Sequence, residues 1–239
     1  MKNQYVADIG DYGKCALLRA FIDNGFALGL NWYLTLDDDS KDGRHTDYLS
    51  SSKPYPDEGL RASLCEIFEN GFRNVSSIEN SGLLQNTIFY HDVLDFDVSK
   101  PAVNRLRQRG DWHNNAIQKL SGCDIVFLDP DTGLEVKSVN PISKDGNRYA
   151  TNEEVMDYFN KGQNVIIYQH GKRISQVEQD TIFYEFGVRN NIPKKQFRWI
   201  SFRPYSVRYY LMLIQKRDVK RVNNLIDELL NRWDPLFQS

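Results

Sequence analysis

The feature that most constrains this chain is a short apolar run followed at once by two aspartates. Residues 125–128 read Ile-Val-Phe-Leu, and Asp129-Pro130-Asp131 comes next. An unbroken apolar run of this length is typical of a strand buried on both faces of a mainly parallel sheet. Pro130 has no amide hydrogen and restricts the residue before it to extended conformations, so we expect the strand to end there. Ligands bind at the carboxyl ends of such strands, which makes Asp129 a candidate site residue.

Strand-like and helix-like segments alternate along the rest of the chain. Apolar runs predict strands over 26–36, 87–90 and 164–168, and residues 4–9 are a strand or an extended arm. The predicted helices cover 13–25 (after a turn at 10–13), 57–70, 72–79, 99–120 as one helix or two, 151–162, 175–185 and 219–233. Two runs near the end, 197–202 and 207–215, are joined by a short link typical of an antiparallel hairpin. Such alternation predicts a doubly wound, mainly parallel, Rossmann-like α/β sheet that ends in this hairpin.

Composition narrows the class of protein. The chain has 239 residues, of which 41% are hydrophobic, so it can bury a full core, and we expect one domain over 1–239. A formal net charge of -2 excludes a generally basic nucleic-acid binder but not a local basic strip. The three cysteines lack the spacing of a zinc site or a disulfide framework, which favours a reducing cytoplasm. No apolar stretch approaches the ~20 residues of a membrane span, so no membrane association is expected.

Polar residues follow each predicted parallel strand. Asp37 comes after 26–36 and opens an acidic loop over 37–48, Asp92 comes after 87–90, and His170 comes after 164–168. Asp11 and Lys14 stand where the first helix begins, with Asp11 as a candidate cap. We expect these side chains to converge on Asp129, beneath a mobile polar loop over 136–150.

Basic residues gather in two places. Arg105, Arg107 and Arg109 precede a tryptophan, and Lys172 and Arg173 follow the fourth predicted strand. Arginines beside an aromatic ring are suited to nucleic-acid phosphate and bases, although they are equally typical of a solvated helix face. Nucleic acid is therefore a possible partner.

Two of these segments resemble class I S-adenosylmethionine-dependent methyltransferases, which have a terminal antiparallel hairpin on a doubly wound sheet. Asp129-Pro130-Asp131 is similar to the Asp/Asn-Pro-Pro-aromatic motif of amino-methyltransferases. Residues 10–18 (GDYGKCALL) resemble the Asp-x-x-Lys-His segment of ribosomal RNA adenine-N6 methyltransferases. The resemblance implies methylation of an amino group of nucleic acid, with Asp11 and Lys14 near the cofactor and Asp129 near the target amine.

The resemblance also implies a role for Asp92, and further residues are predicted to serve the same site. Asp92 would lie near the adenosine of the cofactor, and Asp37, after the first strand, is a further predicted cofactor contact. Asp131 and His170 are predicted to act beside Asp129 in catalysis.

The chain departs from the family pattern at two points. The turn after the first strand reads Thr-Leu-Asp-Asp-Asp over 35–39 and has no glycine before Gly43, although the family has a glycine-rich turn there. Asp131 and Thr132 stand where the family has a proline and an aromatic residue that stacks on the base.

The surplus of acids supports a second interpretation. Asp129, Asp131 and Glu135, joined by Asp37, Asp39 or Asp92, provide the hard oxygen ligands that Mg²⁺ prefers. Such ions position water and stabilise the leaving oxygen in phosphodiester cleavage, with His170, Lys172 or Lys14 stabilising charge. A third interpretation is a binding module that has kept the fold and lost the chemistry.

Overall fold

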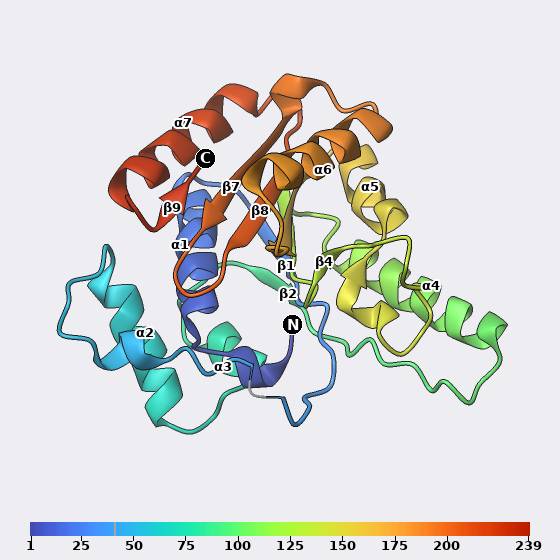
Figure 1. Cartoon of the computed structure of the whole chain (residues 1–239), viewed down its shortest axis with the longest axis horizontal. Coiled ribbons are helices and arrows are strands. Elements are labelled where there is room, and N and C mark those ends of the chain that lie inside the picture. Colours follow the sequence, from blue (N-terminus) through green and yellow to red (C-terminus); the bar gives the residue numbers. More distant parts are fainter. Residues whose placement is uncertain (41) are drawn as a thin grey trace.

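A central β-sheet positions every other element of the molecule (Figure 1). The computed structural model describes residues 1–40 and 42–239, and Lys41, in the predicted loop 37–48, lies outside the described residues. Within them the sheet has seven strands in the order β2-β1-β3-β6-β8-β7-β9. These strands are β1 (Leu28–Asn31), β2 (Ile88–Tyr90), β3 (Ile125–Leu128), β6 (Asn164–His170), β7 (Phe197–Phe202), β8 (Arg208–Leu213) and β9 (Phe237–Gln238).

The strand directions confirm the predicted α/β class with a mostly parallel sheet. β2, β1, β3 and β6 are parallel neighbours. β8 lies between β6 and β7 and runs antiparallel to both, and β9 pairs antiparallel with β7. The predicted hairpin over 197–215 is therefore present, and its second strand is the one that joins the parallel part of the sheet.

Helices cover both faces of the sheet. They are α1 (Ile9–Asp23), α2 (Glu58–Glu69), α3 (Val75–Asn80), α4 (Ala102–Lys119), α5 (Asn152–Asn160), α6 (Gln176–Arg189) and α7 (Val219–Arg232). Buried side chains of α1, α2, α3 and α7 belong to one hydrophobic cluster, and those of α4, α5 and α6 belong to another. In β3, Ile125 and Phe127 join the first cluster while Val126 and Leu128 join the second. Successive strand residues point to opposite faces, which explains why this run is apolar without interruption.

The start of α1 corrects two predictions. Residues 4–9 are not a strand, and Gly10 and Gly13, predicted in a turn, lie inside the helix. The helix begins early because the Asp8 side chain, rather than that of Asp11, accepts hydrogen bonds from the Gly10 and Asp11 amides. The glycines are needed for packing, because a Cβ atom on Gly13 would lie 2.7 Å from the Phe202 ring.

The predicted strand over 26–36 is shorter than expected. It ends at Asn31, and Tyr33 has a φ of 44°, a left-handed conformation that breaks the extended chain. The predicted helix over 99–120 is a single helix, α4. None of the helices in the described part of the chain combines the length and the apolarity needed to cross a membrane.

The loop over 136–150 is held in place rather than free. Its end forms β5 (Tyr149–Ala150), which pairs in parallel with β4 (Gly133–Leu134). Arg109 of α4 donates hydrogen bonds to the carbonyls of Pro141, Gly146 and Tyr149. The loop was expected to be mobile because it is polar, but a buried guanidinium fixes its backbone.

Candidate functional site

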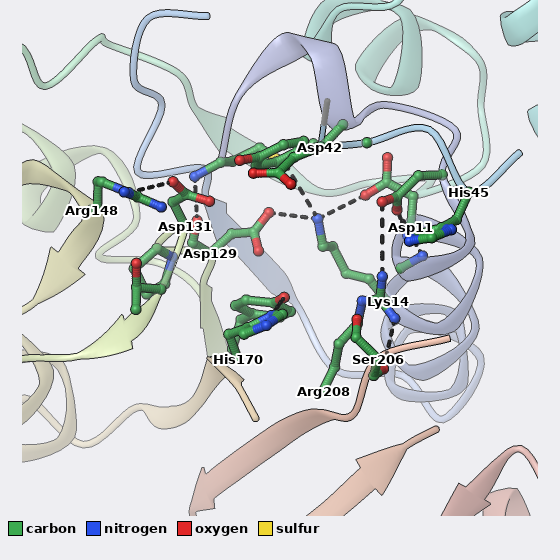
Figure 2. Close-up of a pocket in the computed structure, with 18 residues that line it drawn as sticks. Asp11, Lys14, Asp42, His45, Asp129, Asp131, Arg148, His170, Ser206 and Arg208 are labelled. Atoms are coloured by element: carbon green, nitrogen blue, oxygen red, sulfur yellow. Dashed lines mark hydrogen bonds and ion pairs between the residues drawn. The ribbon is translucent and has the colours of Figure 1, made fainter. Parts of the chain in front are cut away.

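The candidate site lies at the carboxyl ends of the central parallel strands. The connection from β1 to β2 runs through α2 and α3 on one face of the sheet, and the connection from β2 to β3 runs through α4 on the other face. Because β2 and β3 lie on opposite sides of β1, the direction of winding reverses between the neighbouring strands β1 and β3. In open α/β sheets, ligands bind at such a reversal. A pocket of about 290 Å³ is found here, lined by the start of α1, by the segment after β3, by the end of β6 and by the start of β8 (Figure 2).

A buried lysine between two carboxylates forms the centre of the pocket. Lys14 Nζ lies 2.8 Å from Asp11 Oδ1 and 2.6 Å from Asp129 Oδ2, and all three side chains are at most 5% exposed (Figure 2). The ammonium also lies 5.3 Å from the centre of the Trp32 ring. A charge in such a place is tolerated only because its neighbours neutralise it.

Burial and ion pairing act in opposite directions on the pKa values of this cluster. Burial alone would lower the pKa of Lys14, but Asp11 and Asp129 hold it well above its ordinary value. Burial raises the pKa of Asp129, and Lys14 limits that rise. Lys14 is therefore charged at neutral pH, and the cluster joins α1 to the end of β3 through charge-assisted hydrogen bonds.

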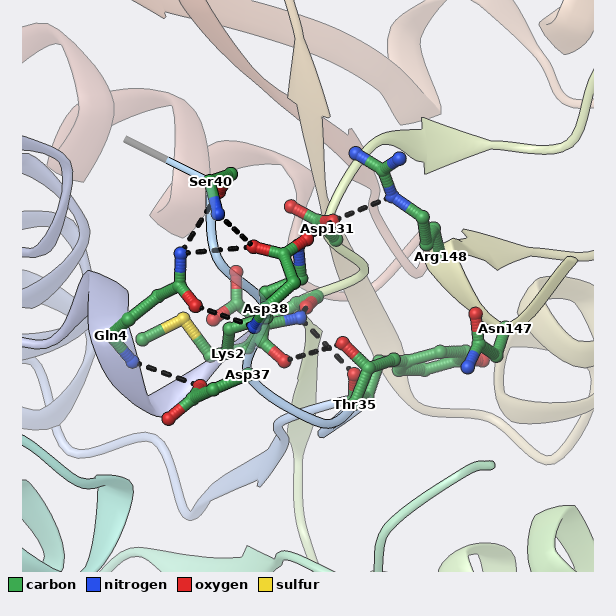
Figure 3. Close-up of polar contacts among 12 residues, drawn as sticks. Lys2, Gln4, Thr35, Asp37, Asp38, Ser40, Asp131, Asn147 and Arg148 are labelled. Carbon is green, nitrogen blue, oxygen red and sulfur yellow. Dashed lines mark hydrogen bonds and ion pairs between the residues drawn. The ribbon is translucent and has the colours of Figure 1, made fainter. Parts of the chain in front are cut away.

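A second set of charges holds Asp131. Arg148 Nε donates a hydrogen bond of 2.7 Å to Asp131 Oδ2, and Lys2 Nζ lies 3.7 Å from the same oxygen (Figure 3). Burial would raise the pKa of Asp131, but the Met1 amine, Arg148 and Lys2 together lower it. Asp131 is thus ionised and belongs to an ion-pair network rather than standing free.

The Met1 amine lies against the pocket. It donates hydrogen bonds to the backbone carbonyls of Tyr33, 3.1 Å away, and Asp129, 2.9 Å away. Burial lowers the pKa of this amine to about 6, although Asp129 and Asp131 oppose that effect. Two carbonyls at the ends of β1 and β3 thus form an acceptor pair for an amine.

His170 and Arg208 close the other side of the pocket. Arg208 lies 3.8 Å from Asp8. Burial raises the pKa of the Asp8 carboxyl, and the charge of Arg208 limits that rise. Partial burial and the Arg208 charge lower the pKa of His170. His170 therefore presents a neutral imidazole at pH 7.

The predicted convergence of strand-end residues is partly correct. Asp11, Lys14, Asp129, Asp131 and His170 all line the pocket.

Asp37 and Asp92 do not join them. Asp37 accepts a hydrogen bond from the Gln4 amide and, with Asp38, ties down the first residues of the chain (Figure 3). Because β1 ends at Asn31, Asp37 lies well past the sheet edge. Asp92 is exposed at the end of β2 and lines a different cavity with Tyr90 and His91.

The predicted magnesium ligands do not form a metal site. Glu135 is exposed and accepts a hydrogen bond from the Asn152 amide, whereas Asp129 and Asp131 pair with Lys14 and Arg148. Over residues 1–40 and 42–239, no group of three or more His, Cys, Asp or Glu side chains is arranged to hold a metal ion. The acids are already neutralised by cations of the chain itself, so the residues present do not fit Mg²⁺.

The arginines of α4 do not form a basic strip. Arg109 is buried and makes a two-pronged ion pair with Glu154, with distances of 2.6 and 2.8 Å. Arg105 donates to the Ile142 carbonyl of the 136–150 loop, and Arg107 is exposed. The three residues face different surroundings because consecutive odd positions on a helix point in different directions. Lys172 and Arg173 are exposed after β6, as predicted.

Several lining residues were missed from the sequence. They are Met1, Tyr5, Arg148, Tyr168, Ser206 and Arg208. Asp8, which also lines the pocket, carries a readable signal, because an aspartate before a helix is a preferred cap. The six missed residues come from the first residues of the chain, from two loops and from β6 and β8, and only the packing of these distant segments brings them together.

A comparison of the chain with models of protein families finds no match, and no curated protein matches it. The function is therefore inferred from the geometry of the pocket and from the fold.

Proposed function

We propose that the chain is an S-adenosylmethionine-dependent methyltransferase that acts on an amino group. The observation that carries the proposal is the contact between the two segments that resemble this class. Lys14, of the segment 10–18, lies 2.6 Å from Asp129, although 115 residues separate them. The resemblance implied that both segments serve one site, and nothing in the local sequence of either requires them to meet.

The strand order supports the proposal by analogy of fold. β8 is inserted between β6 and β7 and is antiparallel to both, which gives a doubly wound sheet a terminal antiparallel hairpin. Class I methyltransferases have such a hairpin, although a shared fold alone does not establish an activity.

The missing glycine turn has a counterpart in the structure. Tyr33, two residues after β1, takes a φ of 44°, a conformation that glycine adopts easily and tyrosine rarely does. Strained backbone of this kind gathers at functional sites. The residue is held by its hydroxyl group, which donates to Glu154 3.3 Å away, and its carbonyl is one of the two that accept the Met1 amine.

The residues present fit the amino-acid end of the cofactor. The carbonyls of Tyr33 and Asp129 already accept an amine. Arg208, whose nearest acid, Asp8, is 3.8 Å away, offers positive charge for a carboxylate, whereas Lys14 is already paired with Asp11 and Asp129. The pocket, at about 290 Å³, is just below the ~300–1,000 Å³ typical of ligand sites. We infer that Met1, which uses the same two carbonyls, moves aside when the cofactor binds.

The chain supplies orientation and a proton acceptor. The bound cofactor provides an electrophilic methyl group, and Asp129 accepts a hydrogen bond from the acceptor amine so that the nitrogen lone pair faces that group. Lys14 holds the Asp129 carboxylate in place. Neutral His170 takes the proton that the amine loses. Orientation supplies most of the rate, because methyl transfer needs little other proton chemistry.

We place the acceptor amine on nucleic acid. Lys172 and Arg173 are exposed two and three residues after His170 and can contact phosphate beside the pocket. This part of the proposal does not depend on the arginines of α4.

Calorimetric titration with S-adenosylmethionine tests the cofactor. We expect saturable heat in the wild-type chain, and the absence of heat at millimolar ligand would contradict the proposal. Transfer of a labelled methyl group to RNA and DNA then tests the reaction. Asp129→Asn should lower transfer by roughly 100-fold or more, in the range of a lost positioning or proton-transfer group. Asp23→Asn, at the exposed far end of α1, should leave transfer unchanged.

A further inference from the structure

The link between β7 and β8 carries an exposed aromatic residue in a strained conformation. Tyr205 has a φ of 63° and is 59% exposed. Left-handed backbone is unfavourable for a bulky residue and persists only where its surroundings impose it. Here the surroundings are Arg208, whose guanidinium donates to the carbonyls of Pro204, at 3.0 Å, and Ser206, at 2.9 Å. The buried arginine therefore fixes the backbone on both sides of an exposed ring.

A second ring lies against Tyr205. His45, from the loop before α2, stacks on it with ring centres 4.4 Å apart and planes 25° from parallel. The His45 carbonyl accepts the amide of Ile9 at 2.9 Å, which ties this loop to the start of α1. The two rings come from opposite ends of the chain, and both remain exposed. Rings that only stabilise a fold are normally buried, because burial provides their stabilisation.

The pair stands beside the charged pocket. His45 and Ser206 line it, on the side opposite Arg148 (Figure 2). Lys14, Asp129 and His170 supply hydrogen-bonding groups farther inside. At the end of β3, Thr132 offers no ring. An exposed aromatic face beside convergent polar groups is the arrangement that recognises a flat ring with a polar edge.

We propose that a nucleobase-like heteroaromatic ring stacks on the Tyr205–His45 pair and directs its polar edge into the pocket. The proposal rests on the proposed function for the identity of the ring. Two sources share this chemistry, the base that carries the acceptor amine and the adenine of the methyl donor.

The four histidines of the chain provide a direct test by proton NMR. His45→Gln assigns the His45 C2-proton signal, and adenosine is the first probe. We expect adenosine to shift the signals of His45 and, less strongly, His170. The signals of His91, which pairs with Glu79, and of buried His113 should stay in place. Shifts of all four signals alike, or of none, would overturn the proposal.

Variants of Tyr205 separate recognition from folding. Tyr205→Gly removes the ring and accepts the positive φ without strain, so the chain should fold as before. We expect it to weaken adenosine binding about fivefold or more, as for loss of one stacking partner, while Tyr205→Phe restores binding. Tyr184→Ala, which removes an equally exposed tyrosine of α6, should have no effect. Wild-type affinity in Tyr205→Gly would refute the proposal.

Two further probes identify the source of the ring. If S-adenosylhomocysteine shifts the His45 signal and a short oligoribonucleotide does not, the ring belongs to the donor, and the reverse result assigns it to the acceptor. A response to adenosine or oligonucleotide without any heat from S-adenosylmethionine would support the stacking pair and contradict the methyltransferase function. Heat from S-adenosylmethionine with an unmoved His45 signal would support the methyltransferase function and contradict the stacking pair.

Discussion

Replacing Lys14 by methionine should expose how much the pocket depends on its buried cation. The change keeps most of the side-chain volume but leaves Asp11 and Asp129, both nearly inaccessible to solvent, without their shared ammonium. Removing one partner of a buried ion pair costs about 3–5 kcal/mol. With a urea m-value of roughly 3 kcal/mol per molar for a chain of this size, the midpoint of unfolding should fall by about 1–2 M.

The loss should depend on pH in a definite direction. Burial raises the pKa of Asp129, and Lys14 is the cation that most opposes that rise, so without Lys14 the folded-state pKa of this carboxyl is higher still. A carboxyl with a raised pKa contributes stability that is present at low pH and lost as the pH rises through that value. The free energy of unfolding of Lys14→Met should therefore fall further below that of wild type at pH 7 than at pH 5. In wild type, Lys14 remains charged up to and beyond its ordinary pKa of 10.5.

Urea unfolding followed by circular dichroism measures both effects. Lys220→Met, on the exposed side of α7, is the matched control and should change stability by no more than about 0.5 kcal/mol. Adding Asp129→Asn to Lys14→Met should recover part of the loss. A loss below about 1 kcal/mol for Lys14→Met, with no dependence on pH, would mean that water reaches these carboxylates and would refute the reasoning.

Three further predictions concern Arg109, its partner Glu154 and the cap of α5. Arg109→Met should lower the free energy of unfolding, measured in urea, by about 3–5 kcal/mol, because Glu154 stays buried but loses its cation and the 136–150 loop loses its hydrogen bonds to Arg109. Arg107→Met, on the exposed side of α4, should be nearly neutral. Burial would raise the pKa of Glu154, but Arg109 lowers it, so this pair stabilises the fold above the ordinary pKa of 4.5 and stabilises it less as the pH falls below that value. Glu154→Gln should therefore make the free energy of unfolding less dependent on pH in this acidic range. An unchanged pH dependence would count against the pair. Thr151→Ala should cost about 1 kcal/mol by breaking the capping box of α5, and a melting temperature equal to that of wild type would contradict the assigned cap.

The parts of the fold that were predictable from sequence depend on patterns within one segment. Residues 125–128 were recognised as a strand because both faces of β3 are covered, which makes every position apolar. The cap at Thr151 can be read from the sequence, because its partner, Glu154, is only three residues away. The position of the site followed from topology, because parallel strands bring Asp129 and His170 to one edge.

The parts that were not predictable depend on partners far along the chain. Gly10 and Gly13 look like a turn until Phe202 and Arg208, from the C-terminal hairpin, are packed against them. Arg109 looks like a solvated or nucleic-acid-binding residue because Glu154, its partner, is 45 residues away. Tyr33, as a bulky residue, gives no hint of its left-handed backbone, so the length of β1 and the position of Asp37 were misjudged.

The central claim is that the Lys14–Asp129 pocket holds the methyl donor. A crystal structure of the chain with S-adenosylhomocysteine tests it most directly. We predict ligand density with its amino group on the carbonyls of Tyr33 and Asp129 and with Met1 displaced from them. A ligand bound elsewhere, or a pocket in which Met1 keeps both hydrogen bonds at saturating ligand, would contradict the account.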